Sequence, residues 1–449
     1  MSAQGYDAVV MGGGPAGEVV VSRLNRQGLK VALVERELVG GECAYWACIP
    51  SKTLLRPPET RAEAGRAAGV ARPLIEWAEV AKYRDYMIRN LDDTAQVEGY
   101  RKGGVDVFKG VGRLVGSGQV EVGGRVLETR RIVVATGSDA HIPPIEGLEE
   151  AGYWTNREAT TLSEIPESIV ILGGGPVGIE LGQFLRRFGS RVVLVEGGER
   201  LLEREHPAVS EMIAQTLREE GIEVHLNADA SRVTRENGER VLHLKSGAQV
   251  SGHELLVATG RAPRVHDIGL EAVGISPDAG GISIDERCRA GDGVWAIGDV
   301  TGVMPFTHVG MYQARITAAD IAGEKPRADY TAIPRVVFSD PEIAAVGVTE
   351  EQARERGIEI ATSRVKLADV IARPWTYEKD PRGELGLIAD RKQGTLIGAW
   401  SVAPMAGEWI HYAVLAIKTR TPISVLRDTV AQFPTFTEAY LKGVERLEI

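Results

Sequence analysis

A pattern of about thirty residues occurs twice in this chain, and it constrains the fold more than any other feature. The first copy, residues 6–35, reads YDAVVMGGGPAGEVVVSRLNRQGLKVALVE, and the second, residues 168–196, reads SIVILGGGPVGIELGQFLRRFGSRVVLVE. In each copy an apolar run meets a glycine-rich turn, and a second apolar run ends in glutamate. This order predicts strand, turn, helix and strand, so the chain is expected to contain two related α/β units.

Both glycine turns have the spacing Gly-x-Gly-x-x-Gly that dinucleotide-binding units use. The first glycine allows a tight turn, the second lets backbone approach a pyrophosphate, and the third lets the helix pack closely on the strand. The glutamate follows the last glycine by eighteen residues in both copies, where it can accept hydrogen bonds from ribose hydroxyls. A glycine turn without a ligand is the alternative, which the complete context disfavours. The predicted binding residues are Gly12, Gly14, Gly17 and Glu35 for one dinucleotide and Gly173, Gly175, Gly178 and Glu196 for the other.

The acidic residue that ends the second copy bears on which nicotinamide nucleotide is bound. Glu196 favours a free 2′-hydroxyl over a 2′-phosphate, and hence NADH over NADPH. Arg200 and Arg204 follow soon after it and are suited to a phosphate, so the sequence favours NADH without deciding the matter.

Three further segments place a glycine or an acidic residue at the end of an expected strand. Residues 130–147 and 253–265 each contain an apolar run that leads into Ala-Thr-Gly, ending at Gly137 and Gly260, and each follows one of the glycine turns. We expect these strands to close the two nucleotide units, with their backbone passing near the ligand. Residues 293–300, GVWAIGDV, form an apolar run before Asp299, where a carboxylate at a strand end is placed to hold a sugar-like hydroxyl. A simple turn residue is the alternative for Asp299.

Two of the three cysteines lie five residues apart in GGECAYWACIPSK, residues 40–52. In a regular helix, Cα atoms at this separation are roughly 8.5 Å apart, and a disulfide needs less than about 7 Å. A redox-active Cys43–Cys48 pair therefore requires an irregular turn, which the neighbouring glycines and proline permit. Two buried thiols that never meet are the alternative. Cys288 is interpreted as a packing or surface residue.

Composition restricts the class of protein. With 449 residues the chain is expected to form two to four domains. Its net charge of −10, with no basic run, argues against nucleic acid or an anionic membrane as a partner. No apolar run is long enough to span a membrane, no secretion signal is recognised, and no cysteine–histidine spacing indicates a metal site. We expect a cytoplasmic protein without a structural disulfide framework.

Taken together, these motifs resemble the FAD-dependent pyridine nucleotide-disulfide oxidoreductases, the family of lipoamide dehydrogenase, mercuric reductase and the soluble transhydrogenase, from Tyr6 to about Tyr440. The resemblance implies that the first glycine turn, Glu35 and Asp299 hold FAD, and that the second turn and Glu196 hold NAD(P)H. It also implies that Lys52 and Glu180 form the family's ion pair beside the flavin. In the disulfide-reducing members, the counterpart of Cys43 attacks the substrate and that of Cys48 faces the flavin.

The implied fold class is α/β, with two Rossmann-like domains and a C-terminal α+β dimerisation domain. The FAD domain is expected at 1–150 and 262–330, the NAD(P) domain at 151–261 and the dimerisation domain at 331–449, with a mostly helical excursion over 52–100. The resemblance further implies a homodimer in which C-terminal residues of one subunit complete the active site of the other.

One position departs from the family. Where a catalytic histidine is expected, five residues before a glutamate, this chain has Phe433 in AQFPTFTEAY, followed by Glu438. Phenylalanine accepts no proton, and a general base typically contributes roughly 10² to 10⁴ in rate. Glu42, next to Cys43, is expected to oppose thiolate formation as well. The transhydrogenase branch also lacks the histidine and carries a tryptophan like Trp46, but it lacks the second cysteine that this chain keeps.

The predicted function is therefore an NAD(P)H-dependent flavoprotein oxidoreductase with a Cys43–Cys48 pair beside the flavin. Its small-molecule electron acceptor is expected to be a quinone or another acceptor that is not lipoamide. Two alternatives stay open. One is a true disulfide reductase in which Glu438, or a residue from the partner subunit such as Tyr412, moves the proton. The other is a non-catalytic flavin redox sensor.

Overall fold

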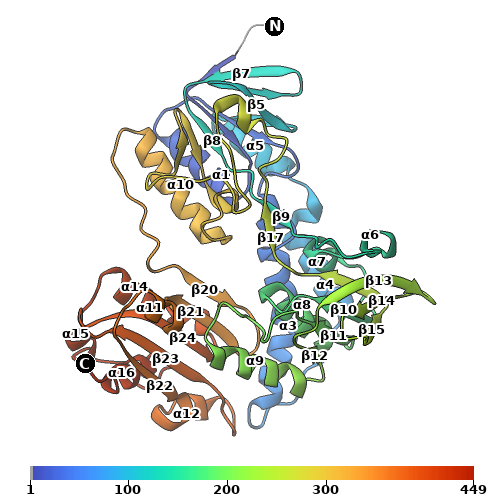
Figure 1. Ribbon diagram of the computed structural model, residues 1–449, viewed down its shortest axis with the longest axis vertical. Helices are drawn as coiled ribbons and strands as arrows, with labels where there is room; N and C mark the ends of the chain where they lie inside the picture. The colour runs from blue at the N-terminus through green and yellow to red at the C-terminus, as the bar shows by residue number, and fades with distance from the viewer. Residues whose placement is uncertain (1–3) are drawn as a thin grey trace. The chain divides into compact units, whose positions relative to one another are not determined.

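The computed structural model describes residues 4–449 and divides them into two compact units. The first unit contains the chain up to Ser51 together with Lys82–Ile142 and Gly260–Asp329. The second contains Lys52–Ala81, Pro143–Thr259 and Tyr330–Ile449 (Figure 1). Within residues 4–449, no helix combines the length and the apolar character needed to cross a membrane.

A six-stranded sheet forms the centre of the first unit, and all its strands except the edge strand β18 run parallel. Its order is β18 (Arg289–Gly291), β19 (Val294–Ala296), β8 (Ile132–Val134), β2 (Ala8–Met11), β3 (Val31–Glu35) and β4 (Asp106–Lys109). Alternate residues of β2 join different cores: Ala8 and Val10 pack with helix residues, and Val9 and Met11 pack with the neighbouring sheet. Both faces are therefore buried, which explains the continuous apolar run in the sequence.

Helices α1 (Pro15–Arg26) and α10 (Thr307–Ile321) pack against each other on one face of this sheet (Figure 1). A smaller sheet on the other face consists of β1 (Gln4–Tyr6), β7 (Arg125–Thr129), β6 (Gln119–Val122) and β5 (Gly112–Gly116), and β9 (Ser138–Ala140) pairs separately with β17 (Arg261–Pro263). The remaining elements are α2 (Gly41–Tyr45), α5 (Thr94–Lys102) and the 3₁₀ turns η1 (Arg89–Leu91), η2 (Leu270–Val273) and η3 (Gly298–Thr301). The division between the units falls inside α3 (Cys48–Arg66) and α4 (Trp77–Met87).

The second unit contains the second copy of the repeated pattern. Its parallel sheet has the order β12 (Glu223–His225), β11 (Arg191–Val195), β10 (Ser168–Leu172) and β16 (Glu254–Val257). An antiparallel sheet follows, with β13 (Ala230–Glu236), β14 (Glu239–Leu244) and β15 (Gln249–Gly252). The helices of this part are α6 (Leu148–Ala151), α7 (Asn156–Thr161), α8 (Pro176–Arg187) and α9 (Pro207–Glu219).

The C-terminal part of the second unit is an antiparallel sheet covered by helices. Its strands are β20 (Pro334–Val337), β21 (Glu342–Gly347), β24 (Thr395–Ala403), β23 (Glu384–Asp390) and β22 (Ile360–Lys366). Its helical segments are α11 (Glu350–Glu355), α12 (Leu367–Val370), η4 (Pro374–Thr376), α13 (Ala406–Trp409), α14 (His411–Lys418), α15 (Ile423–Arg427) and α16 (Glu438–Glu445). The predicted fold class is confirmed: two parallel α/β units and an α+β C-terminal part are present. The predicted domain boundaries stay a prediction.

Close backbone contacts fix both glycine turns in the same way. A Cβ atom on Gly17 would lie 1.9 Å from the Gly12 oxygen, and one on Gly178 would lie 2.0 Å from the Gly173 oxygen. Each third glycine thus lets its helix contact the preceding strand. The first glycines, Gly12 at φ +109° and Gly173 at φ +117°, adopt a backbone conformation that side chains rarely permit.

Candidate active site

The cysteine loop has the interruption that a working pair requires. Helix α2 ends at Tyr45, and α3 begins at Cys48, so the two cysteines lie on different helices rather than on one regular helix. A Cβ atom on Gly41, at φ +62°, would lie 2.6 Å from the Cα of Gly14. The loop therefore packs directly on the first glycine turn, and the predicted irregular turn is confirmed.

A threonine from a distant part of the chain contacts both cysteines. The Thr307 hydroxyl donates to the Cys43 sulfur at 3.3 Å, and its Oγ1 lies 3.4 Å from the Cys48 sulfur. Both cysteines are partly buried, and no disulfide joins the described cysteines. Hydrogen bonding with Cys48 and burial raise the pKa of the Cys43 thiol above its usual range, and the bond from Thr307 acts in the opposite direction. The two thiols are neighbours in this structure, and a working Cys43–Cys48 pair stays a prediction.

The carboxylate next to Cys43 is accompanied by positive charge. Glu42 oxygens lie 4.0 Å from a guanidinium nitrogen of Arg261 and 3.8 Å from one of Arg264. These ion pairs offset the negative charge that the sequence suggested would oppose thiolate formation at Cys43. Burial and Cys48 account for the raised pKa of the thiol instead.

The predicted Asp299 belongs to a hydrogen-bonded group at the end of β19. Asp299 is the second residue of the turn η3, and it accepts a hydrogen bond of 2.6 Å from the Ser138 hydroxyl. Arg261 donates to the same hydroxyl at 2.7 Å. Gly137 precedes Ser138 and Gly260 precedes Arg261, both at positive φ, so the two Ala-Thr-Gly segments lead into paired strands β9 and β17. Asp299 therefore lies in a turn, but it is tied through the hydrogen bonds of Ser138 to the two paired strands.

The glutamates that end the two patterns hold their glycine turns alike. Glu35 accepts from the Gly13 amide at 2.6 Å, and Glu196 accepts from the Gly174 amide at 2.6 Å. Helices α1 and α8 begin without a side-chain cap. A Cβ atom on Gly175 would meet nothing within 4 Å, and one on Gly14 would meet only Gly41, at 3.9 Å. Uncapped helix N-termini behind open glycine backbone suit two pyrophosphates, so the residues present fit FAD and a nicotinamide dinucleotide.

In the second unit the predicted ion pair is formed. Lys52 Nζ lies 2.7 Å from Glu180 Oε2, with 36% of the lysine side chain and 7% of the glutamate side chain exposed. Phe338 supports both partners, since its amide donates to Glu180 Oε1 at 2.9 Å and its ring centroid lies 4.6 Å from Lys52 Nζ. Sequence reasoning missed Phe338, which follows β20 in a segment without a motif.

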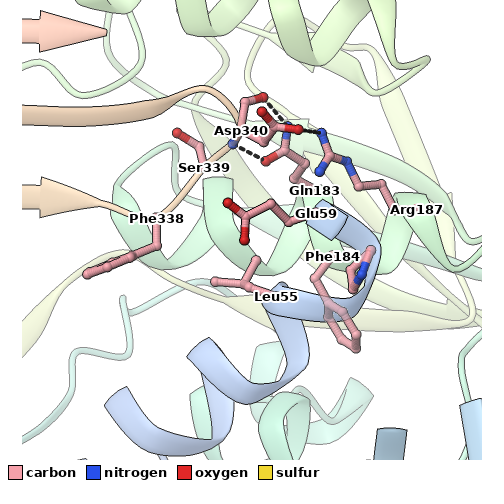
Figure 2. A pocket seen from close by; sticks show the side chains of 9 residues that line it. Leu55, Glu59, Gln183, Phe184, Arg187, Phe338, Ser339 and Asp340 are labelled. Carbon is pink, nitrogen blue, oxygen red and sulfur yellow. Dashed lines mark hydrogen bonds and ion pairs between the residues drawn. The ribbon is translucent and has the colours of Figure 1, made fainter. Parts of the chain in front are cut away.

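Figure 2 shows how the segment after Phe338 is attached to α8, beside a pocket that Phe338 and Asp340 help to line. Gln183 donates to the Asp340 carbonyl at 2.9 Å and accepts from the Asp340 amide at 2.8 Å. Arg187 donates to the Asp340 carboxylate at 2.9 Å. Because Glu180, Gln183 and Arg187 all lie on α8, one helix positions the ion pair and the backbone that supports it.

The position of the expected histidine lies at the surface of the C-terminal part. Phe433 is 73% exposed, and Leu415, Val425 and Val430 are also exposed apolar side chains of this part. Glu438 begins α16, and its buried Oε2 has no hydrogen-bond partner among the described residues. Residues 4–449 contain no group of histidine, cysteine and acidic side chains suited to a metal ion.

Comparisons with known proteins agree with this architecture. The family model "Pyridine nucleotide-disulphide oxidoreductase" matches residues 6–314, and the model of that family's dimerisation domain matches residues 333–443. The chain is 32% identical to a mercuric reductase of Bacillus cereus over 96% of its own length and 70% of the relative's, and 32% identical to a dihydrolipoyl dehydrogenase of Bacillus subtilis over 98% and 96%. The solved Cu(II) complex of the HOCl-induced flavoprotein disulfide reductase RclA from Escherichia coli is similar at a TM-score of 0.88 and 28% identity, over 98% of this chain and 99% of that one.

A carboxyl near the pocket gives a pH-dependent prediction. Burial, together with the charges of Glu59, Glu408 and Asp340, raises the pKa of Glu342 from 4.5 to about 7. Between pH 4.5 and about pH 7, Glu342 is ionised in the unfolded chain but still protonated in the folded chain. The free energy of unfolding that Glu342 contributes therefore falls as the pH rises through this range. Glu342→Gln keeps an acceptor for the Gly407 amide, which donates at 2.9 Å. We expect it to stabilise the fold by about 1–2 kcal/mol above neutral pH and by much less below pH 4.5.

Urea unfolding at a series of pH values measures this difference. Glu359→Gln is the matched control, because the Glu359 side chain is 81% exposed and lies 4.0 Å from its nearest cation. A stability difference between Glu342→Gln and the unsubstituted protein that is constant across pH would contradict the assignment.

Proposed function

This chain belongs to the pyridine nucleotide-disulphide oxidoreductase family, and on that premise we propose that Cys43 and Cys48 form its two-electron store. Family membership makes it an enzyme of the FAD-dependent class that uses NAD(P)H. The observation that carries the proposal is the shared hydrogen bonding of the two cysteines with each other and with Thr307. Thiols held this way are placed to form and break a disulfide.

The proposed cofactor sites follow the two glycine turns. When bound, FAD takes a hydride from the nicotinamide and passes two electrons on. The chain's own contribution is to hold phosphates at the N-termini of α1 and α8 and to supply Lys52 as a positive charge, which Glu180 and Phe338 orient. The residues proposed for FAD are Gly12, Gly14, Gly17, Glu35, Gly137 and Asp299, and those for the nicotinamide dinucleotide are Gly173, Gly175, Gly178, Glu196 and Gly260.

We propose an electron acceptor that requires little help from a base, such as a quinone. Two observations support this choice. Phe433 occupies the position of the family's base, and the pKa of the Cys43 thiol is raised rather than lowered. A thiol that keeps its proton is a weak nucleophile toward a substrate disulfide. The rival disulfide reductase would draw on Glu438 or on Tyr412, whose pKa is raised by burial, so that Tyr412 is suited to donate a proton rather than to accept one.

The proposed homodimer is supported by the matched dimerisation domain and by the exposed apolar side chains at Leu415, Val425, Val430 and Phe433. In a homodimer, exposed apolar side chains of this kind would be buried against the partner subunit. In the family arrangement, the Phe433 segment of one subunit would complete the other subunit's site.

The preference for NADH is supported by the charges around the second turn. Glu196 accepts from the Gly198 amide at 2.7 Å, and the Glu203 carboxylate approaches the same glycine, with 3.4 Å between a Cβ built on it and a Glu203 oxygen. Two carboxylates at this turn repel a 2′-phosphate. Arg200, the candidate phosphate ligand, instead donates to the Glu205 carbonyl at 2.6 Å and to the Glu203 carbonyl at 2.6 Å.

We therefore expect kcat/KM for NADH to exceed that for NADPH by about tenfold or more, the effect of roughly one unfavourable charge contact. Glu203→Gln should narrow the ratio by raising kcat/KM for NADPH, since it removes one of the repelling charges. Arg204→Ala is the control for a direct phosphate contact and should leave the ratio unchanged. Steady-state kinetics with both nucleotides decide the matter, and equal use of NADPH by the unsubstituted enzyme would refute the preference.

Replacement of the attacking cysteine separates the two classes of acceptor. With Cys43→Ser, we expect NADH-dependent reduction of a benzoquinone to remain within about threefold of the unsubstituted rate. Reduction of lipoamide and glutathione disulfide is expected to be slow in both proteins. The screen should include Hg(II) and Cu(II), because a relative is a mercuric reductase and a similar structure is a Cu(II) complex. Rapid lipoamide turnover that Cys43→Ser abolishes would establish the rival function.

A further inference from the structure

We propose that the Thr307 hydroxyl relays a proton between Cys43 and Cys48, so that the Cys48 thiolate serves as the base for Cys43. This inference rests on the proposed function, because it requires that the pair be reduced to thiols during turnover. It assigns a proton-transfer role to a residue that no sequence motif marks.

The geometry is that of a single hydroxyl between two sulfur atoms. Thr307 opens α10, and its Oγ1 lies 3.3 Å from the Cys43 sulfur and 3.4 Å from the Cys48 sulfur. A threonine hydroxyl has one proton to donate and two lone pairs to accept with. It donates to Cys43 here, which leaves it able to accept from Cys48 at the same time. One hydroxyl is therefore within hydrogen-bonding distance of both sulfurs, as a relay requires.

The proposed step conserves atoms and charge. Two-electron reduction of a Cys43–Cys48 disulfide, with uptake of one proton, leaves one thiol and one thiolate. Starting from a Cys43 thiol and a Cys48 thiolate, the Cys43 proton moves to Thr307 Oγ1 while the proton of Thr307 moves to the Cys48 sulfur. The product is a Cys43 thiolate and a Cys48 thiol. No electrons are exchanged and no other reactant is needed, so the step moves the proton between the two sulfurs without a histidine.

The charged and titratable groups next to the pair in sequence lie on three elements. On α2, Glu42 is paired with Arg261 and Arg264. On α10, His308 follows Thr307 and is exposed. On α3, Lys52 lies one turn after Cys48. The Cys48 side chain and burial raise the pKa of the Cys43 thiol, whereas hydrogen bonds from Thr307 and from the Cys48 backbone lower it. Removing the hydroxyl is therefore expected to make Cys43 less reactive.

The test measures alkylation of each cysteine rather than turnover. The holoenzyme is reduced anaerobically with dithiothreitol and treated with iodoacetamide over a range of pH, and each modified peptide is quantified by mass spectrometry. Thr307→Val, which keeps the shape and removes the hydroxyl, should slow Cys43 alkylation at neutral pH by about tenfold, as expected for one hydrogen bond to a charged group. The pH profile of Cys43 should also move upward.

Two variants control for a merely structural effect. Thr307→Ser restores a hydroxyl and should return Cys43 alkylation to within about threefold of the original rate. Thr317→Val removes a buried hydroxyl on the same helix that has no hydrogen-bond partner within residues 4–449, and it should leave the rate and profile unchanged. The relay is refuted if Thr307→Val alkylates at the original rate and pH profile, or if Thr307→Ser is as slow as Thr307→Val.

Reduction by NADH distinguishes a failure of the proposed function from a failure of the relay. If NADH, in place of dithiothreitol, exposes no additional thiols in the unsubstituted holoenzyme, the pair does not cycle and both proposals fall. If NADH exposes both thiols and Thr307→Val has no effect, the two-electron store stands and the relay alone is overturned.

Discussion

The close approach of helix to strand at the first glycine turn is the contact on which the candidate site depends. Because a Cβ atom on Gly17 would lie 1.9 Å from the Gly12 oxygen, only glycine lets α1 begin so near β2. The same turn supports the cysteine loop, since Gly41 packs on Gly14. One backbone contact therefore places a helix N-terminus suited to phosphate and sets the loop that carries both cysteines. The second unit repeats the contact at Gly178 and Gly173.

Within each unit, a charged residue of the candidate site has a partner of opposite charge. Glu42 is paired with two arginines, and Lys52 is paired with Glu180. The thiols lack the activation that the family provides. The pKa of the Cys43 thiol is raised, and Phe433 stands where the family has its catalytic base. The chain thus keeps a dithiol while lacking the usual group that activates it, and Thr307 is the polar side chain placed between the sulfurs. These features are the grounds on which we propose an acceptor other than a disulfide.

The sequence predicted what depends on local patterns. The two glycine turns, their glutamates and the break between Cys43 and Cys48 follow from spacing and backbone freedom over a few residues, and the structure shows each of them. The sequence could not predict contacts between distant segments. Thr307 meets Cys48 across 259 residues, and a threonine at a helix start has no distinguishing signal. Likewise the charge of Glu42 seemed unopposed until the fold placed Arg261 and Arg264 beside it.

The central claim is that Cys43 and Cys48 store two electrons beside the flavin, and an anaerobic titration with NADH tests it most directly. The account predicts that reduction continues past one equivalent of NADH per FAD and that a long-wavelength absorbance band from thiolate to flavin develops. Bleaching of the flavin at one equivalent without that band would show that the cysteines take no part. A flavin that NADH does not reduce at all would contradict the catalytic account and favour a redox sensor.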